Sequence, residues 1–247
     1  MAVDLYHFEP NANGGKPLIT LHEKGVAFTS HWVDLLNWQQ HQPEYLAINP
    51  KGQVPTLVHD GYIVTESTPM GEYIDEAFDG PPLRPAGAAG RALMRRWSRY
   101  ADEFLGPSLS MVAWSRFIGP MMRRRSREEL DKALSAIPTK ERVKAWTKTI
   151  EDDFPPEEMA ESLRRIASAA ERIDGQLAQT QWLAGDTYSL ADINVFNMAA
   201  GLPNFLPEKI NSFATPHLLE WIGRVGARPA VRAALAYSRN SLRPIAK

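Results

Sequence analysis

The chain has 247 residues, of which 44% are hydrophobic and 23% charged, and its formal net charge at pH 7 is −1. This length suffices for one large domain or two modest ones, and the near-zero charge favours neither nucleic acid nor an anionic membrane as a partner. No stretch approaches the roughly 20 apolar residues of a membrane helix. The first residues lack the basic and then apolar pattern of a signal peptide, so we expect a cytoplasmic protein.

The sequence contains no cysteine. Disulfide bonds, a thiolate nucleophile, a Cys-x-x-Cys redox pair and a zinc–thiolate centre are therefore all excluded. Any sulfur chemistry must be carried out by a thiol that binds from outside.

The first eighty residues alternate between strand and helix patterns. The elements predicted there are strand 3–8, helix 16–24, strand 28–35, strand 53–60, strand 62–64 and helix 66–78. Asp60-Gly61 is a strong signal for a hairpin turn. The loop Asn11–Gly15 separates the first strand from the first helix. The resulting order, β-α-β-loop-β-β-α, predicts an α/β unit of thioredoxin size.

The composition changes at residues 79–90, where the sequence reads DGPPLRPAGAAG. Proline and glycine at this density cannot continue a helix, so we expect a domain boundary there. Beyond it, apolar spacing predicts only helices. These are 91–105, 157–177, 192–200, 216–227 and 229–238.

The segment 49–55, NPKGQVP, is the most informative in the chain. A proline is tolerated immediately before a strand because its missing N–H need not pair. If the Val54-Pro55 bond is cis, the backbone of Val54 turns outward and can bind an extended peptide like an added strand. A trans bond at a strand edge is the commoner arrangement, and the sequence leaves both open.

Glu66 and Ser67 lie where a strand ends and a helix begins. Either residue could cap the helix, which is a purely structural role. Alternatively, Glu66 could pair with an ammonium group while the hydroxyl and N–H of Ser67 bind a carboxylate at the helix N-terminus. The second arrangement would hold the head group of an amino acid.

Val-Pro at the start of a hairpin, with Glu-Ser opening the next helix, resembles the N-terminal domain of glutathione transferases. Ser189 and Asp192, in the segment SLADI, are similar to the capping box that begins a core helix in the second domain of that family. The resemblance implies a fold of class α/β plus all-α: a thioredoxin-like glutathione-binding domain over 1–79, a linker over 80–90, and an all-helical domain over 91–247 that supplies the hydrophobic substrate side.

Longer stretches of the N-terminal half resemble the bacterial β-etherase branch of that family. These enzymes displace an aryl oxide from lignin-derived β-aryl ethers with the thiolate of glutathione. The resemblance implies glutathione as cosubstrate, no metal, a small aromatic substrate, and a homodimer or a heterodimer with a paralogous transferase. Two alternatives remain: a weakly active subunit that pairs with an active paralogue, and a transferase for other electrophiles.

The resemblance also assigns the glutathione contacts. Gln40, His41 and Gln53 would contact the glycine end and backbone of glutathione, although Gln40 and His41 could equally belong to an exposed polar loop. Val54, with Pro55, would pair with the cysteinyl unit. The γ-glutamyl end would be held by Glu66 and Ser67.

The loop after the first strand departs from the family pattern. Many bacterial members have a serine there that stabilises the thiolate, whereas this chain has Asn13-Gly14-Gly15. A free thiol with a pKa of about 8.5 is only slightly ionised at neutral pH. The remaining candidates to stabilise the thiolate are the side chain of Asn13 and the N–H groups of Gly14 and Gly15. Tyr6, on the first strand, is expected to be a core residue instead.

The second substrate needs an apolar pocket, formed largely by the helical domain. The candidate lining residues are Met111, Trp114, Ser115, Phe117, Ile118 and Trp146. Each of them could equally be an ordinary core residue of a helix.

Overall fold

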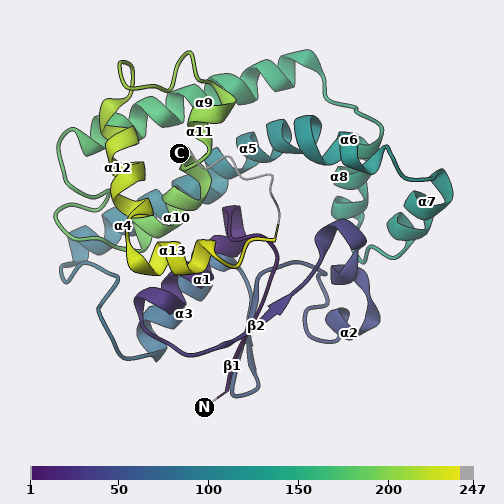
Figure 1. The fold of residues 1–247 in the computed structure, drawn as a ribbon, viewed down its shortest axis with the longest axis horizontal. Helices are drawn as coiled ribbons and strands as arrows, with labels where there is room; N and C mark the ends of the chain where they lie inside the picture. Colours follow the sequence, from purple (N-terminus) through teal and green to yellow (C-terminus); the bar gives the residue numbers. More distant parts are fainter. Residues whose placement is uncertain (1, 240–247) are drawn as a thin grey trace.

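The computed structural model describes residues 2–239, which form an α/β part and a helical part (Figure 1). The elements of the α/β part are β1 (Val3–His7), α1 (Ala12–Glu23), β2 (Thr29–Trp32), the short turns η1 (Leu35–Asn37) and η2 (Gln39–His41), α2 (Pro43–Leu46), β3 (Thr56–His59), β4 (Tyr62–Val64) and α3 (Ser67–Ala77). The predicted thioredoxin-like order is confirmed, and the short α2 lies within the predicted loop.

The four strands form one sheet in the order β2-β1-β3-β4. β1 runs parallel to β2 and antiparallel to β3, and β3 and β4 form the predicted hairpin. Asp60 and Gly61 both have positive φ, 47° and 84°, as a tight two-residue turn requires. Val3 and Leu5 are buried on one face of β1, whereas Tyr6 is half-buried on the other face and stacks on His31. Tyr6 is therefore not the core residue that we expected.

Helix α1 begins at Ala12, four residues before the predicted start, so the predicted loop forms the first turn of the helix. The two glycines that suggested a loop have a packing role. A Cβ on Gly15 would lie 1.8 Å from Oδ1 of Asn197 in the helical part, and one on Gly14 would lie 2.6 Å from the carbonyl oxygen of Glu9. Glycine is needed here because α1 approaches its neighbours closely.

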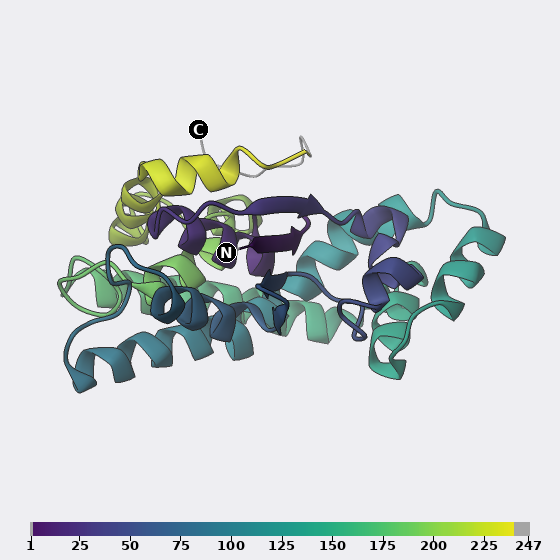
Figure 2. The same cartoon turned by 90° about the horizontal axis from the view of Figure 1, so that it is seen from below.

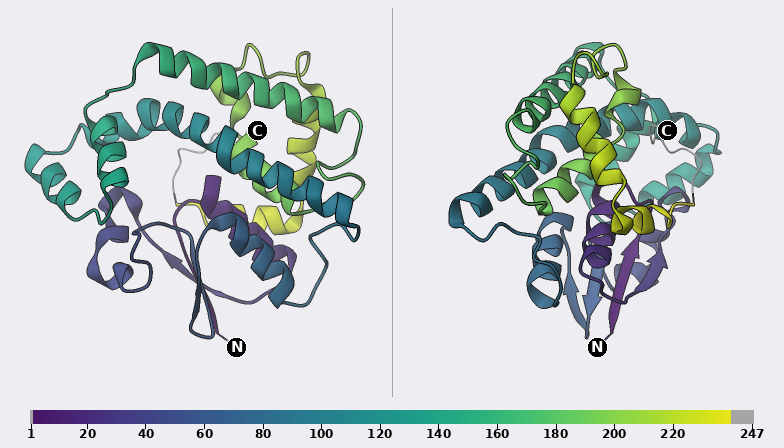
Figure 3. Two further views of the ribbon diagram at one scale, coloured as in Figure 1. Left: turned by 180° about the vertical axis from the view of Figure 1, so that it is seen from behind. Right: turned by 60° about the vertical axis from the view of Figure 1, so that its left-hand side comes forward.

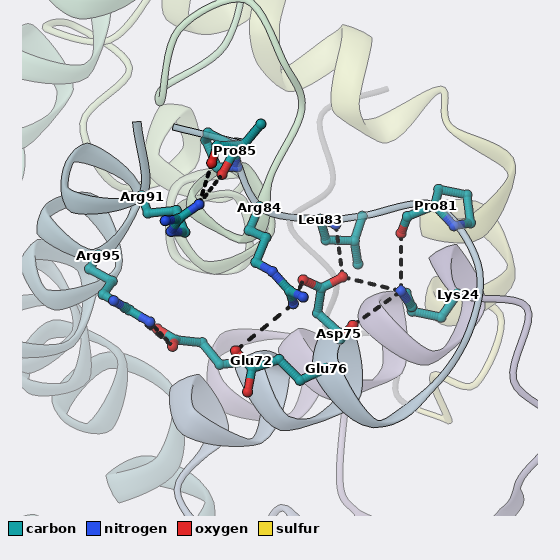
Figure 4. A network of polar contacts seen from close by, with 11 residues as sticks. Lys24, Glu72, Asp75, Glu76, Pro81, Leu83, Arg84, Pro85, Arg91 and Arg95 are labelled. Atoms are coloured by element: carbon teal, nitrogen blue, oxygen red, sulfur yellow. Dashed lines mark hydrogen bonds and ion pairs between the residues drawn. The ribbon is translucent and has the colours of Figure 1, made fainter. Parts of the chain in front are cut away.

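The segment between the two parts is fastened by a buried carboxylate, that of Asp75 on α3 (Figure 4). It accepts hydrogen bonds from Nζ of Lys24 at 3.2 Å, from the N–H of Leu83 at 2.8 Å and from Nη1 of Arg84 at 2.5 Å. Nζ of Lys24 also donates to the carbonyl oxygen of Pro81 at 3.2 Å. The proline-rich segment is thus held against α1 and α3.

Beyond this segment, as far as residue 239, every regular element is a helix. The helices are α4 (Ala88–Tyr100), η3 (Ala101–Leu105), α5 (Gly106–Ala113), η4 (Trp114–Ile118), α6 (Gly119–Met122), α7 (Arg127–Ser135), α8 (Lys140–Ile150), α9 (Pro156–Leu177), α10 (Leu190–Ala199), α11 (Leu202–Phe205), α12 (Pro216–Gly226) and α13 (Pro229–Leu235). Residues 240–247, the end of the predicted helical domain, lie outside the described residues.

The stretch from α4 to α6 is one long helix, much longer than the predicted 91–105. It contains two π-helical turns, η3 and η4, and each is followed by a proline, Pro107 and Pro120. A proline removes an N–H and crowds the carbonyl one turn before it, and the wider π turn accommodates both effects. The rear view in Figure 3 shows α9 running alongside this long helix.

The predicted capping box at Ser189 is confirmed. The side chain of Ser189 accepts a hydrogen bond from the N–H of Ala191, and the carboxylate of Asp192 accepts one from the N–H of Ser189 at 3.0 Å. Burial raises the pKa of Asp192 to about 6, although Nε1 of Trp221 and the N–H of Leu183 also donate to this carboxylate. The box therefore anchors the start of α10 in the middle of the core.

The two parts share one continuous hydrophobic core, in which α1 packs on α10 and α13. Figure 2 shows α13 lying beside α1 although nearly the whole chain separates them. Arg228 and Glu23 join the two helices through hydrogen bonds of 2.6 and 2.8 Å. Within residues 2–239, no helix is long and apolar enough to span a membrane.

Candidate functional site

A polar hollow lies where the start of α1, the loop before β3 and the start of α3 meet. It is lined by Asn13, Asn49, Lys51, Gln53, Val54, Pro55, Thr65, Glu66 and Ser67. Six of these residues were predicted from the sequence. The other three were not: Asn49 and Lys51 lie in the segment 49–55, and Thr65 directly precedes Glu66.

The loop before β3 is held in shape by a buried polar network. Nδ2 of Asn49 donates to the carbonyl oxygen of Gln53 and to Oγ1 of Thr56, both at 2.9 Å. The hydroxyl of Tyr45 donates to the same carbonyl at 2.5 Å. Burial raises the pKa of Tyr45 to about 12, so its hydroxyl remains a donor. The loop is therefore shaped by the protein itself before any ligand binds.

The Val54-Pro55 peptide bond is cis, the rarer of the two alternatives left open by the sequence. Strand β3 begins only at Thr56. Val54 therefore precedes the strand and lines the hollow together with Pro55.

Glu66 and Ser67 form the opposite wall, and neither caps the helix. Glu66 occupies the N-cap position of α3 without a side-chain cap bond, and Ser67 is the first helical residue. Glu66 has φ 65° and ψ 109°, a conformation that costs a residue other than glycine about 1–3 kcal/mol. First-turn N–H groups of a helix lack partners within the helix. The side chain of Glu66 is exposed and pairs with Nζ of Lys51 at 3.0 Å.

Of the three loop residues predicted to face the thiol, Asn13 is exposed and lines the hollow. Gly14 and Gly15 are buried. The N–H of Gly15 donates to the carbonyl oxygen of Asn11 at 3.1 Å, so this group is already used within the helix. Asn13 is the residue of the three whose side chain reaches the hollow.

A buried lysine next to the hollow was not predicted from the sequence. Lys16 is fully buried on α1, donates from Nζ to Oγ1 of Thr68 at 3.2 Å and forms an ion pair with Asp102 on η3. Burial lowers the pKa of Lys16, and the charge of Asp102 partly offsets this effect. The hydrogen bond joins the start of α3 to α1, and the ion pair joins α1 to the helical part.

Gln40 and His41 lie on η2 and are not an exposed loop, because they are 2% and 3% exposed. A Cβ on Gly52 would meet Cδ2 of His41 at 2.7 Å, so both residues lie behind the loop that lines the hollow. Burial, aided by the positive charge of Arg142, lowers the pKa of His41 to about 4. His41 is therefore neutral at physiological pH.

The residues predicted for the aromatic pocket do not form one surface. Trp114, Ile118 and Trp146 join a second, smaller core together with Trp38. Met111 instead faces α9, where Ser162 donates a hydrogen bond to its sulfur at 3.1 Å. Phe117 is 46% exposed and Ser115 is half-buried.

Comparison with known proteins decides the family. A family model described as the N-terminal domain of glutathione S-transferase matches residues 13–77, and one described as its C-terminal domain matches residues 125–229. The chain belongs to the glutathione S-transferase family. The fold resemblance seen in the sequence is thereby confirmed, and the hollow falls within the N-terminal match.

Among the relatives of this transferase is the protein LigF of Sphingobium sp. strain SYK-6. It is 37% identical over 238 residues, which cover 94% of this chain and 92% of LigF. The crystal structure of LigF, described as a β-etherase, superposes with a TM-score of 0.92 over 96% of this chain and 100% of the crystallised chain.

More distant relatives share the family. Glutathione S-transferase F10 of Arabidopsis thaliana is 28% identical over 228 residues, 89% of this chain and 90% of that protein. A transferase family member from Pseudomonas fluorescens, crystallised with two glutathione molecules, is 20% identical and superposes with a TM-score of 0.72 over 95% of this chain and 92% of that one. That last likeness concerns the fold alone.

Proposed function

We propose that this transferase cleaves β-aryl ethers of lignin-derived aromatics with glutathione. The observation that carries the proposal is the 37% identity to a β-etherase along nearly the whole chain. The polar hollow, which lies within the part that matches the glutathione S-transferase N-terminal domain, supports it. In the reaction, the glutathione thiolate attacks the carbon that bears the aryloxy group. A C–S bond forms, the C–O bond breaks and the pair of electrons leaves with the phenolate.

Each wall of the hollow has a proposed role. The carboxylate of Glu66 pairs with the ammonium of the γ-glutamyl unit, and the hydroxyl and N–H of Ser67 bind its carboxylate. The backbone of Val54 pairs with the cysteinyl unit and Gln53 contacts the glycine end, which Gln40 and His41 approach from behind the loop. These roles give glutathione a fixed orientation before the second substrate enters, which lowers the entropic cost of the reaction.

Asn13 is the proposed stabiliser of the thiolate, with the N–H of Gly14 beside it. An amide donor to the sulfur favours the ionised form and lowers the pKa of the thiol. A hydrogen bond to a charged group contributes about 1.5–3 kcal/mol. We place the glutathione domain at 1–79, the linker at 80–90 and the substrate side at 91–247.

A second candidate arises from Gly14. Because a Cβ at this position would lie 2.6 Å from the Glu9 carbonyl oxygen, the chain cannot place a serine there without a backbone shift. The chain could therefore be a weakly active subunit of a heterodimer with a paralogous transferase. The third candidate is a transferase that conjugates glutathione to other electrophiles, since the polar hollow does not itself select the second substrate.

Release of phenol from a β-aryl ether dimer by the purified chain, with and without glutathione, separates these candidates. The proposal predicts glutathione-dependent release by the single chain. Release only after a paralogous chain is added would favour the heterodimer. No release in either case, with turnover of other electrophiles intact, would overturn the ether-cleaving assignment.

A further inference from the structure

Three tryptophans and an arginine form a cluster where the helical part meets the segment that carries η2. Trp38 lies 4.3 Å from Trp146 between ring centroids, and Trp146 lies 4.6 Å from Trp114. The guanidinium of Arg142 lies over the ring of Trp114 at 5.4 Å. On its other side, the ring centroid of Trp38 lies 6.0 Å from that of His41. We call these five residues, with Gln40, the tryptophan–arginine cluster.

The cluster joins distant parts of the chain. Trp38, Gln40 and His41 belong to the segment before α2, whereas Arg142 and Trp146 lie on α8. Figures 1 and 3 both show α8 against that segment. The glutathione hollow is adjacent, because His41 packs against Gly52 in the loop that forms its wall.

Buried polar atoms without partners concentrate in this cluster. Oε1 of Gln40, both ring nitrogens of His41, Nε of Arg142 and Nε1 of Trp146 are all buried without a hydrogen bond to any described residue. Leaving a buried polar group unpaired lowers the stability of the fold. Buried polar groups are normally paired, so five such atoms in one place need an explanation.

The position of Arg142 is unfavourable for stability alone. Its guanidinium forms no ion pair with the residues described, and it lies in the first turn of α8, where the helix dipole disfavours a positive charge. Burial lowers its pKa, with no carboxylate to offset the effect. His41 cannot share the charge because it is neutral at physiological pH. An arginine held in this way is suited to a planar anionic oxygen pair or an aryl oxide next to an aromatic wall.

We propose that Arg142 and the cluster around it bind an anionic oxygen of the reactants, beside the glutathione hollow. The inference rests on the proposed function for its two sources of that oxygen: the glycine carboxylate of glutathione and the phenolate that leaves the ether. In either case Arg142 supplies the positive charge, while Nε1 of Trp146 and a ring nitrogen of His41 are available as neutral donors. The same contact gives Nε of Arg142, Nε1 of Trp146 and the N–H of the His41 ring an acceptor.

The first experiment compares glutathione with its glycyl ethyl ester by calorimetric titration. If the carboxylate is the source, the wild-type chain binds the acid about tenfold more tightly than the ester, as one charge-assisted hydrogen bond gives. Arg142→Gln then loses this preference, and Arg142→Lys keeps part of it. Arg116→Gln, an exposed arginine on the neighbouring η4, is the matched control and keeps all of it.

The second experiment uses 4-nitrophenol as a phenolate probe, with S-methylglutathione filling the hollow. If the phenolate is the source, the wild-type chain binds the coloured anion in preference to the neutral phenol, and Arg142→Gln binds the anion about tenfold more weakly. Neither experiment needs turnover. A chain that shows either preference but releases no phenol refutes the proposed function and retains the anion site.

The proposal is overturned if wild type prefers neither the acid to the ester nor the phenolate to the phenol. It is equally overturned if Arg142→Gln folds, by thermal unfolding, and matches Arg116→Gln in both experiments. If Arg142→Gln does not fold, the two comparisons on the wild-type chain and the binding preferences of Arg142→Lys still test the proposal.

Discussion

The polar hollow that is proposed to bind glutathione and the tryptophan–arginine cluster are neighbours that are built in opposite ways. In the hollow, the loop carbonyl of Gln53 and the hydroxyl of Thr56 are already bound by Asn49 and Tyr45. In the cluster, buried polar atoms of four residues have no partner among the described residues. The first site is therefore organised by the chain itself, whereas the second is proposed to gain its partner from an anionic ligand.

The largest expected effect is on the ion pair between Lys16 and Asp102, next to the hollow. Asp102→Leu removes the carboxylate and leaves the buried ammonium of Lys16 without a charged partner, so we expect a loss of about 3 kcal/mol in the free energy of unfolding, measured in urea. Lys16→Met combined with Asp102→Leu should lose less. Arg99→Met, in an exposed ion pair on the same long helix, should change nothing measurable. A double variant as unstable as the sum of the single variants would show that the pair is not coupled.

The stability of the cluster should depend on pH. The pKa of His41 is lowered from 6.5 to about 4 on folding, so the unfolded chain binds more protons in this window. The stabilisation is complete above pH 6.5 and is lost as the pH falls through 4, with a total of about 3 kcal/mol. His41→Gln should flatten this part of the stability curve from denaturant unfolding. The exposed His217→Gln should keep the wild-type slope, and an unchanged slope in His41→Gln would contradict the assignment.

Asn13 tests whether the hollow activates glutathione as well as holding it. Asn13→Ala should lower kcat about tenfold through loss of the hydrogen bond to the sulfur, with little change in the affinity for glutathione. The pKa of bound glutathione, followed by thiolate absorbance, should rise in the same variant. If kcat and the thiol pKa both stay as in the wild-type chain, the N–H of Gly14 becomes the main candidate.

The smallest effect is expected at Lys51. Its ion pair with Glu66 is exposed on both sides, and such pairs contribute little. Lys51 also competes with the ammonium of glutathione for the same carboxylate. Lys51→Met should therefore bind glutathione as tightly as the wild type, or up to about threefold more tightly. Binding that is several-fold weaker would mean that Lys51 contacts glutathione directly.

What could be predicted from the sequence was local. The Asp60-Gly61 turn, the Ser189 capping box and the order of elements depend on residues a few positions apart, and each was found. The Gly14-Gly15 pair was read as a loop, because its reason is the approach of Asn197 on α10, far along the chain.

Neither the tryptophan–arginine cluster nor the Lys16–Asp102 ion pair could be predicted, because each joins residues that are far apart in the sequence. Lys16 and Asp102 are 86 positions apart, and Arg142 meets the segment of His41 only in the folded chain. Helical spacing marks Trp114 and Trp146 as apolar contacts, but it does not distinguish a core from the wall of a pocket. Charge without a partner is visible only once the contacts are known.

The central claim is that Glu66 and Ser67 hold the γ-glutamyl end of glutathione in the hollow. Calorimetric titration of glutathione into the wild-type chain and into Glu66→Ala/Ser67→Ala tests it most directly. We expect saturable binding of one glutathione per wild-type chain and at least about a hundredfold weaker binding to the double variant, since it loses one ion pair and one charge-assisted hydrogen bond. Equal affinity of the two proteins, both folded, would contradict the claim.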